Sequence, residues 1–144
     1  MKNVKKTKVR PARFLVAFFF LLFLPSPGGA QTCTAERWNS TLTTLLSTHT
    51  TVFTSTPIQD AVNAAGTANV IKVSGTCAEN VLVREEKARI TLDGQGSAAI
   101  AGPDGTIATL RIRGNLITVK GFLPISGGED GILVDRGGTA VIIN

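Results

Sequence analysis

The feature that most constrains the fold is a series of short alternating segments between Asn69 and Asn144. In each segment apolar residues fall at every second position, the pattern of a strand with one buried face, and glycine-rich turns separate the segments. The segments read VIKVSG, ENVLV, ARITLDG, ATLRIRG, LITVKGF, DGILVD and TAVIIN. This half of the chain therefore predicts an all-β fold, with no helical stretch inside the repeat.

These segments recur with a period. When residues 81–83, 110–112 and 132–134 are superposed, their middle residues lie 29 and 22 positions apart. A second set, residues 90–92, 117–119 and 141–143, gives steps of 27 and 24. Two independent columns with a period in the twenties indicate a solenoid, and several short strands per turn indicate a parallel β-helix.

The alternation also predicts which side chains face inward. Two inward columns are expected, one in each sheet: Val81, Val83, Leu110, Ile112, Ile132 and Val134, and Ile90, Leu92, Ile117, Val119, Val141 and Ile143. Because neighbouring rungs lie about 4.8 Å apart, Arg113 should pair with Asp135 and Asp93 with Lys120 on the outer faces. Each such exposed pair stabilises the fold by about 0 to 1 kcal/mol.

The segments IKVSGTCAENVLV, ITLDGQG, LITVKGF and GGEDGILVDRGGTAVIIN resemble the first three turns of right-handed parallel β-helix proteins, the pectate-lyase-like superfamily. The resemblance covers about half of the chain, and its motifs are typical of the architecture rather than of one activity. It implies a secreted or surface protein that cleaves, epimerises or binds polysaccharide, or an adhesin. An enzyme of this kind would be a polysaccharide lyase or a glycoside hydrolase, and Ca²⁺ would be its cofactor by resemblance only.

The N-terminus, residues 1–30, has the pattern of a secretory signal peptide. Six basic residues precede an apolar run from Phe14 to Leu24, which is shorter than the roughly 20 residues of a membrane span. Small residues before Gln31 predict cleavage between Ala30 and Gln31. An uncleaved N-terminal anchor is the alternative, and it is the one route to a membrane that the sequence offers.

The formal charge of +5 comes from this N-terminal segment. Downstream of it the chain has nine basic and ten acidic residues, a net charge of nine minus ten, or −1. Nucleic-acid binding depends on a local excess of Lys and Arg. Lys87 lies with Arg84 and Arg89 in a cluster that also holds two glutamates, which is typical of a solvated turn. We therefore expect no nucleic-acid partner.

Both cysteines, Cys33 and Cys77, lie in the exported part. An even number of cysteines in an oxidising compartment favours a disulfide, and two separate buried thiols are the alternative. Metal binding is not expected, because the chain has no CxxC motif and one histidine, His49. An isolated histidine of this kind is typical of a solvated loop.

Residues 31–55 are rich in Thr and Ser, and we expect a leader that packs loosely on the solenoid. Residues 56–66 predict a capping helix: Thr56 is the expected N-cap, Pro57 the first helical residue, Gln59 the partner in a capping box and Gly66 the end. A short amphipathic helix before residues 69–144 would cover the open end of the first coil, as solenoids require.

Two chemistries would use the polar residues of the rungs. A lyase needs a basic side chain of lowered pKa, and a glycosidase needs two carboxylates about 5 to 9.5 Å apart. The candidates are Asp93, Asp104, Glu129, Asp130 and Asp135 with Arg111, Arg113, Lys120 and Arg136. Asp-Gly dipeptides at several of these positions are also typical of turns. The motifs of the polygalacturonase-like members are missing, so no catalytic, cofactor-binding or metal-binding residue is assigned.

The sequence thus predicts the N-terminal part of a secreted β-helix protein that acts on or binds extracellular polysaccharide. A non-catalytic surface protein, adhesin-like or structural, or a truncated inactive product, is the alternative. Since no polar cap follows the segment TAVIIN, an unpaired strand edge is expected there, and edge-to-edge self-association is a further expectation.

Overall fold

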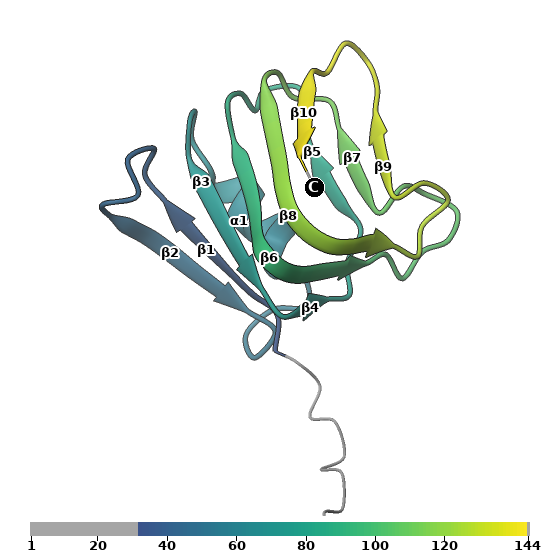
Figure 1. Ribbon diagram of the computed structural model, residues 1–144, viewed down its shortest axis with the longest axis horizontal. Coiled ribbons are helices and arrows are strands. Elements are labelled where there is room, and N and C mark those ends of the chain that lie inside the picture. The colour runs from purple at the N-terminus through teal and green to yellow at the C-terminus, as the bar shows by residue number, and fades with distance from the viewer. Residues whose placement is uncertain (1–31, 144) are drawn as a thin grey trace, which may run out of the picture.

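The computed structural model describes residues 32–143, and over this range the chain is a β-solenoid of about three turns with one short helix (Figure 1). The predicted all-β parallel β-helix architecture is confirmed. The predicted signal peptide and its cleavage site between Ala30 and Gln31 lie outside the described residues.

The smaller sheet, sheet B, confirms the first predicted column. It is built from β5 (Val81–Val83), β7 (Leu110–Ile112) and β9 (Ile132–Val134), which pair in parallel in that order. Val81 lies opposite Leu110, and Leu110 opposite Ile132. Every second residue of β5 and β7 is buried, so the period-2 pattern is the direct cause of this sheet.

The larger sheet, sheet A, runs along the other side of each turn. Its parallel part is formed by β3 (Val70–Ser74), β6 (Thr91–Ala101), β8 (Ile117–Ser126) and β10 (Ala140–Ile143), and β4 (Thr76–Cys77) pairs with β6. Both β6 and β8 bend sharply, as Figure 1 shows. Gln95, Gly96 and Gly121 adopt positive φ at these bends, the conformation that glycine adopts without strain.

The last strand corrects the second predicted column. Leu92 lies opposite Val119 as expected, but in β10 it is Ile142, not Val141 or Ile143, that continues this inward column. Val141 and Ile143 lie opposite Thr118 and Lys120, whose side chains point outward. A shift of one residue moves every side chain to the other face. All four residues of β10 are apolar, so alternation could not specify its register.

The N-terminal segment is more ordered than predicted. Instead of a loosely packed leader, it forms β1 (Thr34–Trp38) and β2 (Leu45–Thr50), an antiparallel hairpin. Strand β1 also pairs antiparallel with β3, so the hairpin extends sheet A beyond its first parallel strand. Ala35 is fully buried. Threonines favour strands because their branched side chains fit a pleated surface.

The predicted helix is present as α1 (Pro57–Ala64), with Thr56 as N-cap residue and Pro57 in the first turn. It buries Ile58, Ala61 and Val62 in the core and packs on β1, β2, β3 and β5. The expected capping role is therefore confirmed. The predicted capping box is wrong, because the Thr56 side chain makes no cap hydrogen bond and the Gln59 side chain bonds to Leu82 instead.

The ends of α1 are capped by the first turn of the solenoid. Both oxygens of the Glu79 carboxylate accept hydrogen bonds, from the backbone N–H groups of Ile58 and Gln59, each at 2.9 Å. At the other end Lys87 Nζ donates to the carbonyls of Asn63 and Ala65, each at 2.8 Å. An anion at the N-terminus and a cation at the C-terminus complement the helix dipole. The Lys87 N–H also donates to the carbonyl of Arg84 at 3.1 Å, so the predicted turn is present and the Lys87 side chain caps α1 from it.

The side chain of Gln59 covers the free edge of sheet B. Its Oε1 accepts the backbone N–H of Leu82 at 2.7 Å, and its Nε2 donates to the carbonyl of the same residue at 3.1 Å. One amide side chain thereby takes the place of a neighbouring strand at the middle of β5. The edge of a sheet is a template for pairing, and α1 closes this one.

The core is continuous from the hairpin to the third turn. A disulfide joins Cys33 and Cys77, whose Cα atoms lie 4.9 Å apart, and both residues are fully buried. The predicted disulfide is therefore present in the structure. Within the part of the chain that the structure describes, α1 falls short of the length and hydrophobicity that a membrane span needs.

Candidate functional site

The outer surface of sheet B carries two leucines and three charged side chains, and we call this surface the arginine face: Leu82, Arg111, Arg113, Leu133 and Asp135. Leu82, Arg111 and Leu133 are directly opposite one another in β5, β7 and β9. Arg113 and Asp135 extend the ladder just beyond the strands, since the backbone N–H of Asp135 donates to the carbonyl of Ile112 at 3.0 Å. The rungs thus stack two guanidinium groups and one carboxylate on a single surface.

Asp135 holds both arginines of this face. Its Oδ2 accepts hydrogen bonds from Nε of Arg111 at 3.0 Å and from Nη2 of the same side chain. Its Oδ1 accepts from Nε of Arg113 at 3.1 Å. The predicted pairing of Arg113 with Asp135 is confirmed. Oε1 of Glu85 lies 3.7 Å from Nη1 of Arg113 and 4.0 Å from Nη1 of Arg136.

These contacts fix the charges of the arginine face. Hydrogen bonds from Arg111, and then those from Arg113, lower the pKa of the Asp135 carboxyl although partial desolvation opposes them. The same carboxylate raises the pKa of the Arg111 guanidinium. A base that removes a proton needs a pKa near the working pH, so the environment of Arg111 acts against that role.

A shallow groove of about 130 Å³ lies beside the two arginines. Leu82 and Ile107 are among the apolar residues that line it, and Asn80, Arg111 and Arg113 are its polar ones. Asn80 fixes the loop above the groove: its Oδ1 accepts the Asp104 N–H at 3.0 Å, and its Nδ2 donates to the carbonyls of Asp104 and Ala108 at 3.3 and 3.2 Å. These hydrogen bonds hold the loop of residues 104–108 beside the groove.

The other candidate carboxylates have structural partners. Asp104 accepts hydrogen bonds from the hydroxyl and backbone N–H of Thr106, which lower the pKa of Asp104 and close a turn. Asp93 pairs with Lys120 at 3.1 Å, as predicted, and this pair lies on sheet A. Asp93 also accepts the Gln95 N–H at 2.9 Å. The structure therefore does not bring Asp93 and Asp135 together.

Glu129 and Asp130 are exposed in the turn between β8 and β9. Their backbone groups hydrogen-bond to the loop of the preceding turn. The Glu129 N–H donates to the carbonyl of Ile107, and the Asp130 carbonyl accepts from the Thr109 N–H. Among residues 32–143, neither side chain makes an ion pair with Arg111 or Arg136.

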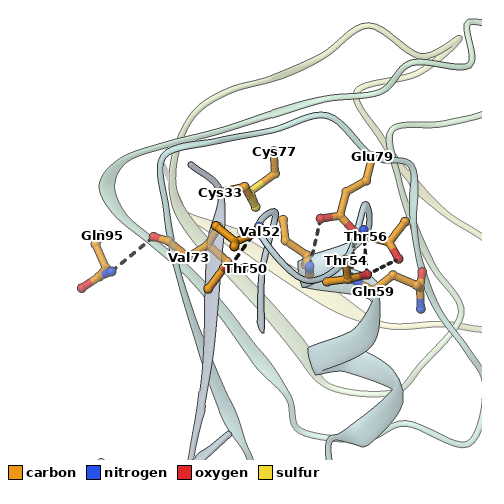
Figure 2. The surroundings of a disulfide bond; sticks show 11 residues. Cys33, Thr50, Val52, Thr54, Thr56, Gln59, Val73, Cys77, Glu79 and Gln95 are labelled. Carbon is orange, nitrogen blue, oxygen red and sulfur yellow. Dashed lines mark hydrogen bonds between the residues drawn. A yellow bond between two sulfur atoms is a disulfide. The ribbon is translucent and has the colours of Figure 1, made fainter. Parts of the chain in front are cut away.

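Glu79 is the acidic residue that sequence reasoning missed. It is 2% exposed, lies against the N-terminus of α1 and is close to the disulfide (Figure 2). Burial raises its pKa, opposed by the two backbone hydrogen bonds. The sequence does contain a signal for Glu79. It is a charged residue two positions after Cys77, and it lies between two segments whose apolar residues form the core. A raised pKa marks catalytic acids elsewhere, but this carboxyl is engaged with α1.

Glu79 and the two cysteines also form the one group of three potential metal ligands found within residues 32–143, with ligand atoms within 4.8 Å of one another. The two sulfurs are bonded to each other, and a metal ligand must be a thiolate. This group therefore does not bind a metal in its oxidised form. His49 lies on β2 opposite Ala35, and its Nε2 hydrogen-bonds to the Ser47 hydroxyl at 3.1 Å.

A second, larger groove of about 600 Å³ opens at the end of the solenoid formed by β8, β9 and β10. Its lining is almost entirely apolar: Val119, Lys120, Phe122, Leu123, Pro124, Ile125, Ile132 and Ile142. Val119, Phe122, Ile125, Ile132 and Ile142 continue the core columns of the earlier turns, where the corresponding side chains are covered by the next rung. We call this surface the end groove.

No model of a known protein family, no curated protein and no solved structure matches this chain.

Proposed function

We propose that this chain belongs to a secreted protein that binds extracellular polysaccharide through the arginine face, without cleaving it there. The observation that carries the proposal is that Arg111 and Arg113 are both held by Asp135 and line a groove whose other residues are mostly apolar. Such an arrangement presents guanidinium N–H groups to ligand carboxylates and an apolar surface to the face of a sugar ring. The ligand class is a polysaccharide that carries carboxylate groups.

The disulfide supports export, because disulfides persist in oxidising compartments. The state of the carboxylates in the rungs favours binding over catalysis. Asp104 and Asp135 both have a lowered pKa and fixed partners, whereas a general acid needs a raised pKa in an accessible position. The alternative function, a purely structural solenoid, would make the arginine face a solvated surface.

Substitution of Arg111 by Ala should weaken binding to a carboxylated polysaccharide such as polygalacturonate about tenfold, as expected for the loss of a charge-assisted hydrogen bond. Binding is measured by isothermal titration calorimetry at two salt concentrations. The matched control is Lys120→Ala, which also removes a basic side chain paired with an aspartate on a neighbouring strand, but on sheet A. Equal loss in both variants, or no binding by the parent protein, would contradict the proposal.

A comparison with a neutral polysaccharide such as dextran distinguishes polysaccharide binding from a purely structural role. The proposal predicts binding of the carboxylated polymer only, and weaker binding as salt screens the charges. Measurable binding of neither polymer would favour the structural solenoid.

A further inference from the structure

The turn between β1 and β2, residues 39–44, contains an acceptor sequence for N-linked glycosylation. Asn39, Ser40 and Thr41 match the pattern Asn-X-Ser/Thr, in which X is any residue except proline. The other asparagines of the described chain lack a hydroxyl residue two positions later: Asn63, Asn69, Asn80 and Asn115. The described part of the chain therefore offers a single acceptor for this modification.

This turn lies at the surface, where a bulky glycan has room. Every residue from 40 to 46 is exposed, and Leu42, in the middle of the turn, has 44% of its surface accessible. In Figure 1 the turn forms the tip of the hairpin of β1 and β2 at the left of the view, whereas the strands of sheet B lie on the right. A glycan attached at this tip extends into solvent, away from the arginine face.

The Asn39 side chain is held in place by the turn itself. Its Oδ1 accepts hydrogen bonds from the backbone N–H groups of Thr43 at 2.9 Å and Thr44 at 3.2 Å. Its Nδ2 donates to the Thr43 hydroxyl at 2.9 Å. An amide nitrogen carries two hydrogens, and a glycosidic bond replaces one of them. The oxygen that accepts the backbone hydrogen bonds is unchanged, so the folded turn accommodates the modified side chain.

Thr41 supplies the hydroxyl at the second position after the acceptor. In the exposed turn its Oγ1 hydrogen-bonds with the Thr43 hydroxyl at 2.9 Å. Loss of the Thr41 hydroxyl removes a required part of the acceptor sequence, while Asn39 and its two backbone hydrogen bonds remain. Position 41 therefore allows the modification to be tested without a change to the asparagine.

We propose that Asn39 is the attachment site of an N-linked glycan when this chain is exported through a eukaryotic secretory pathway. In the reaction, Nδ2 of Asn39 forms a bond to the anomeric carbon of an oligosaccharide carried on a lipid diphosphate. The bond from that carbon to the diphosphate oxygen breaks, the lipid diphosphate leaves, and Nδ2 loses one proton to a base, with no atom oxidised or reduced. The inference shares with the proposed function only the export of the chain.

Translation of the full chain, with its own N-terminal segment, in the presence of endoplasmic-reticulum microsomes tests the proposal. The wild type should gain the mass of one oligosaccharide and become protected from added protease. Treatment with peptide-N-glycosidase F should remove the added mass. That enzyme converts the acceptor asparagine to aspartate, so peptide mass spectrometry should locate the change at position 39.

Three variants identify the acceptor. Thr41→Val removes the hydroxyl at nearly constant shape and should abolish the added mass, whereas Thr41→Ser retains a hydroxyl and should keep it. Thr43→Ala is the matched control, because it removes another hydroxyl of the same turn and leaves the acceptor sequence intact. This control should be modified like the wild type.

Protection from protease distinguishes the ways in which the proposal can fail. A wild-type chain that is protected but carries no sugar would overturn the glycan and leave export intact. A chain that is not protected would overturn both the glycan and the export that the proposed function assumes. Sugar on the Thr41→Val variant would contradict the assignment of Asn39.

Discussion

At the scale of single residues, Glu79 shows how a charge can be structural and still leave a signature in solution. Its carboxylate is buried, yet both oxygens accept backbone hydrogen bonds at the start of α1. A missing cap would leave the buried N–H of Ile58 without a partner, which costs about 1 to 3 kcal/mol, and would also free the N–H of the partly buried Gln59. Burial nevertheless raises the pKa of this carboxyl, so the ionised form is less favourable here than in the unfolded chain.

The sign of this pKa change predicts a dependence of stability on pH. The unfolded chain loses the proton of Glu79 near pH 4.3, while the folded chain keeps it to a higher pH. The contribution of this group is therefore fully present below about pH 4 and declines as pH rises through the folded pKa. The free energy of unfolding of the wild type, measured with urea, should fall relative to Glu79→Gln over this interval.

The difference between two pH profiles is the quantity to compare, because Asp104 and Asp135 have lowered pKa values and act in the opposite direction in both proteins. Glu86→Gln, which changes an exposed carboxylate, is the control and should follow the wild type. Parallel profiles for wild type and Glu79→Gln would show that burial does not change the proton affinity of Glu79.

At the scale of elements, the junction between α1 and β5 decides whether sheet B has a free edge. Gln59→Leu removes both hydrogen bonds to Leu82 at nearly constant volume. The expected loss is about 1 to 2 kcal/mol of unfolding free energy, with faster hydrogen exchange of the Leu82 amide. Gln59→Glu retains an acceptor for the Leu82 N–H and should lose less. Unchanged exchange at Leu82 in Gln59→Leu would contradict the role of Gln59 as an edge cap.

At the scale of the whole molecule, the disulfide ties the hairpin to the first turn over 44 residues of chain. Loop-closure entropy for a ring of this size corresponds to about 4 kcal/mol in the chain-entropy account. The Cys33→Ala, Cys77→Ala double variant should therefore lose about 2 to 4 kcal/mol and unfold at lower denaturant concentration. Reduction of the wild type should give the same loss. A double variant as stable as the oxidised wild type would contradict this estimate.

The arginine face and the end groove also belong to this scale, because each is assembled from several turns. Their constituent residues were visible in the sequence, and the pairing of Arg113 with Asp135 was predicted from the repeat. The groove beside them was not, since it depends on the loop that Asn80 fixes from the preceding turn. The partnership of Arg111 with the same carboxylate also appears only when the side chains are placed.

The sequence by itself determined the strands of the repeat, the stacking of β5, β7 and β9, the capping helix and the pair of cysteines. These features follow from alternation, period and local turn chemistry, which neighbouring residues encode. The tertiary structure alone decided the register of β10, whose four apolar residues carry no alternation, and the hairpin of β1 and β2. The hydrogen bond from the Ile58 N–H to the Glu79 carboxylate, 21 residues away, also depends on the tertiary structure. The two groups meet only when the chain has folded.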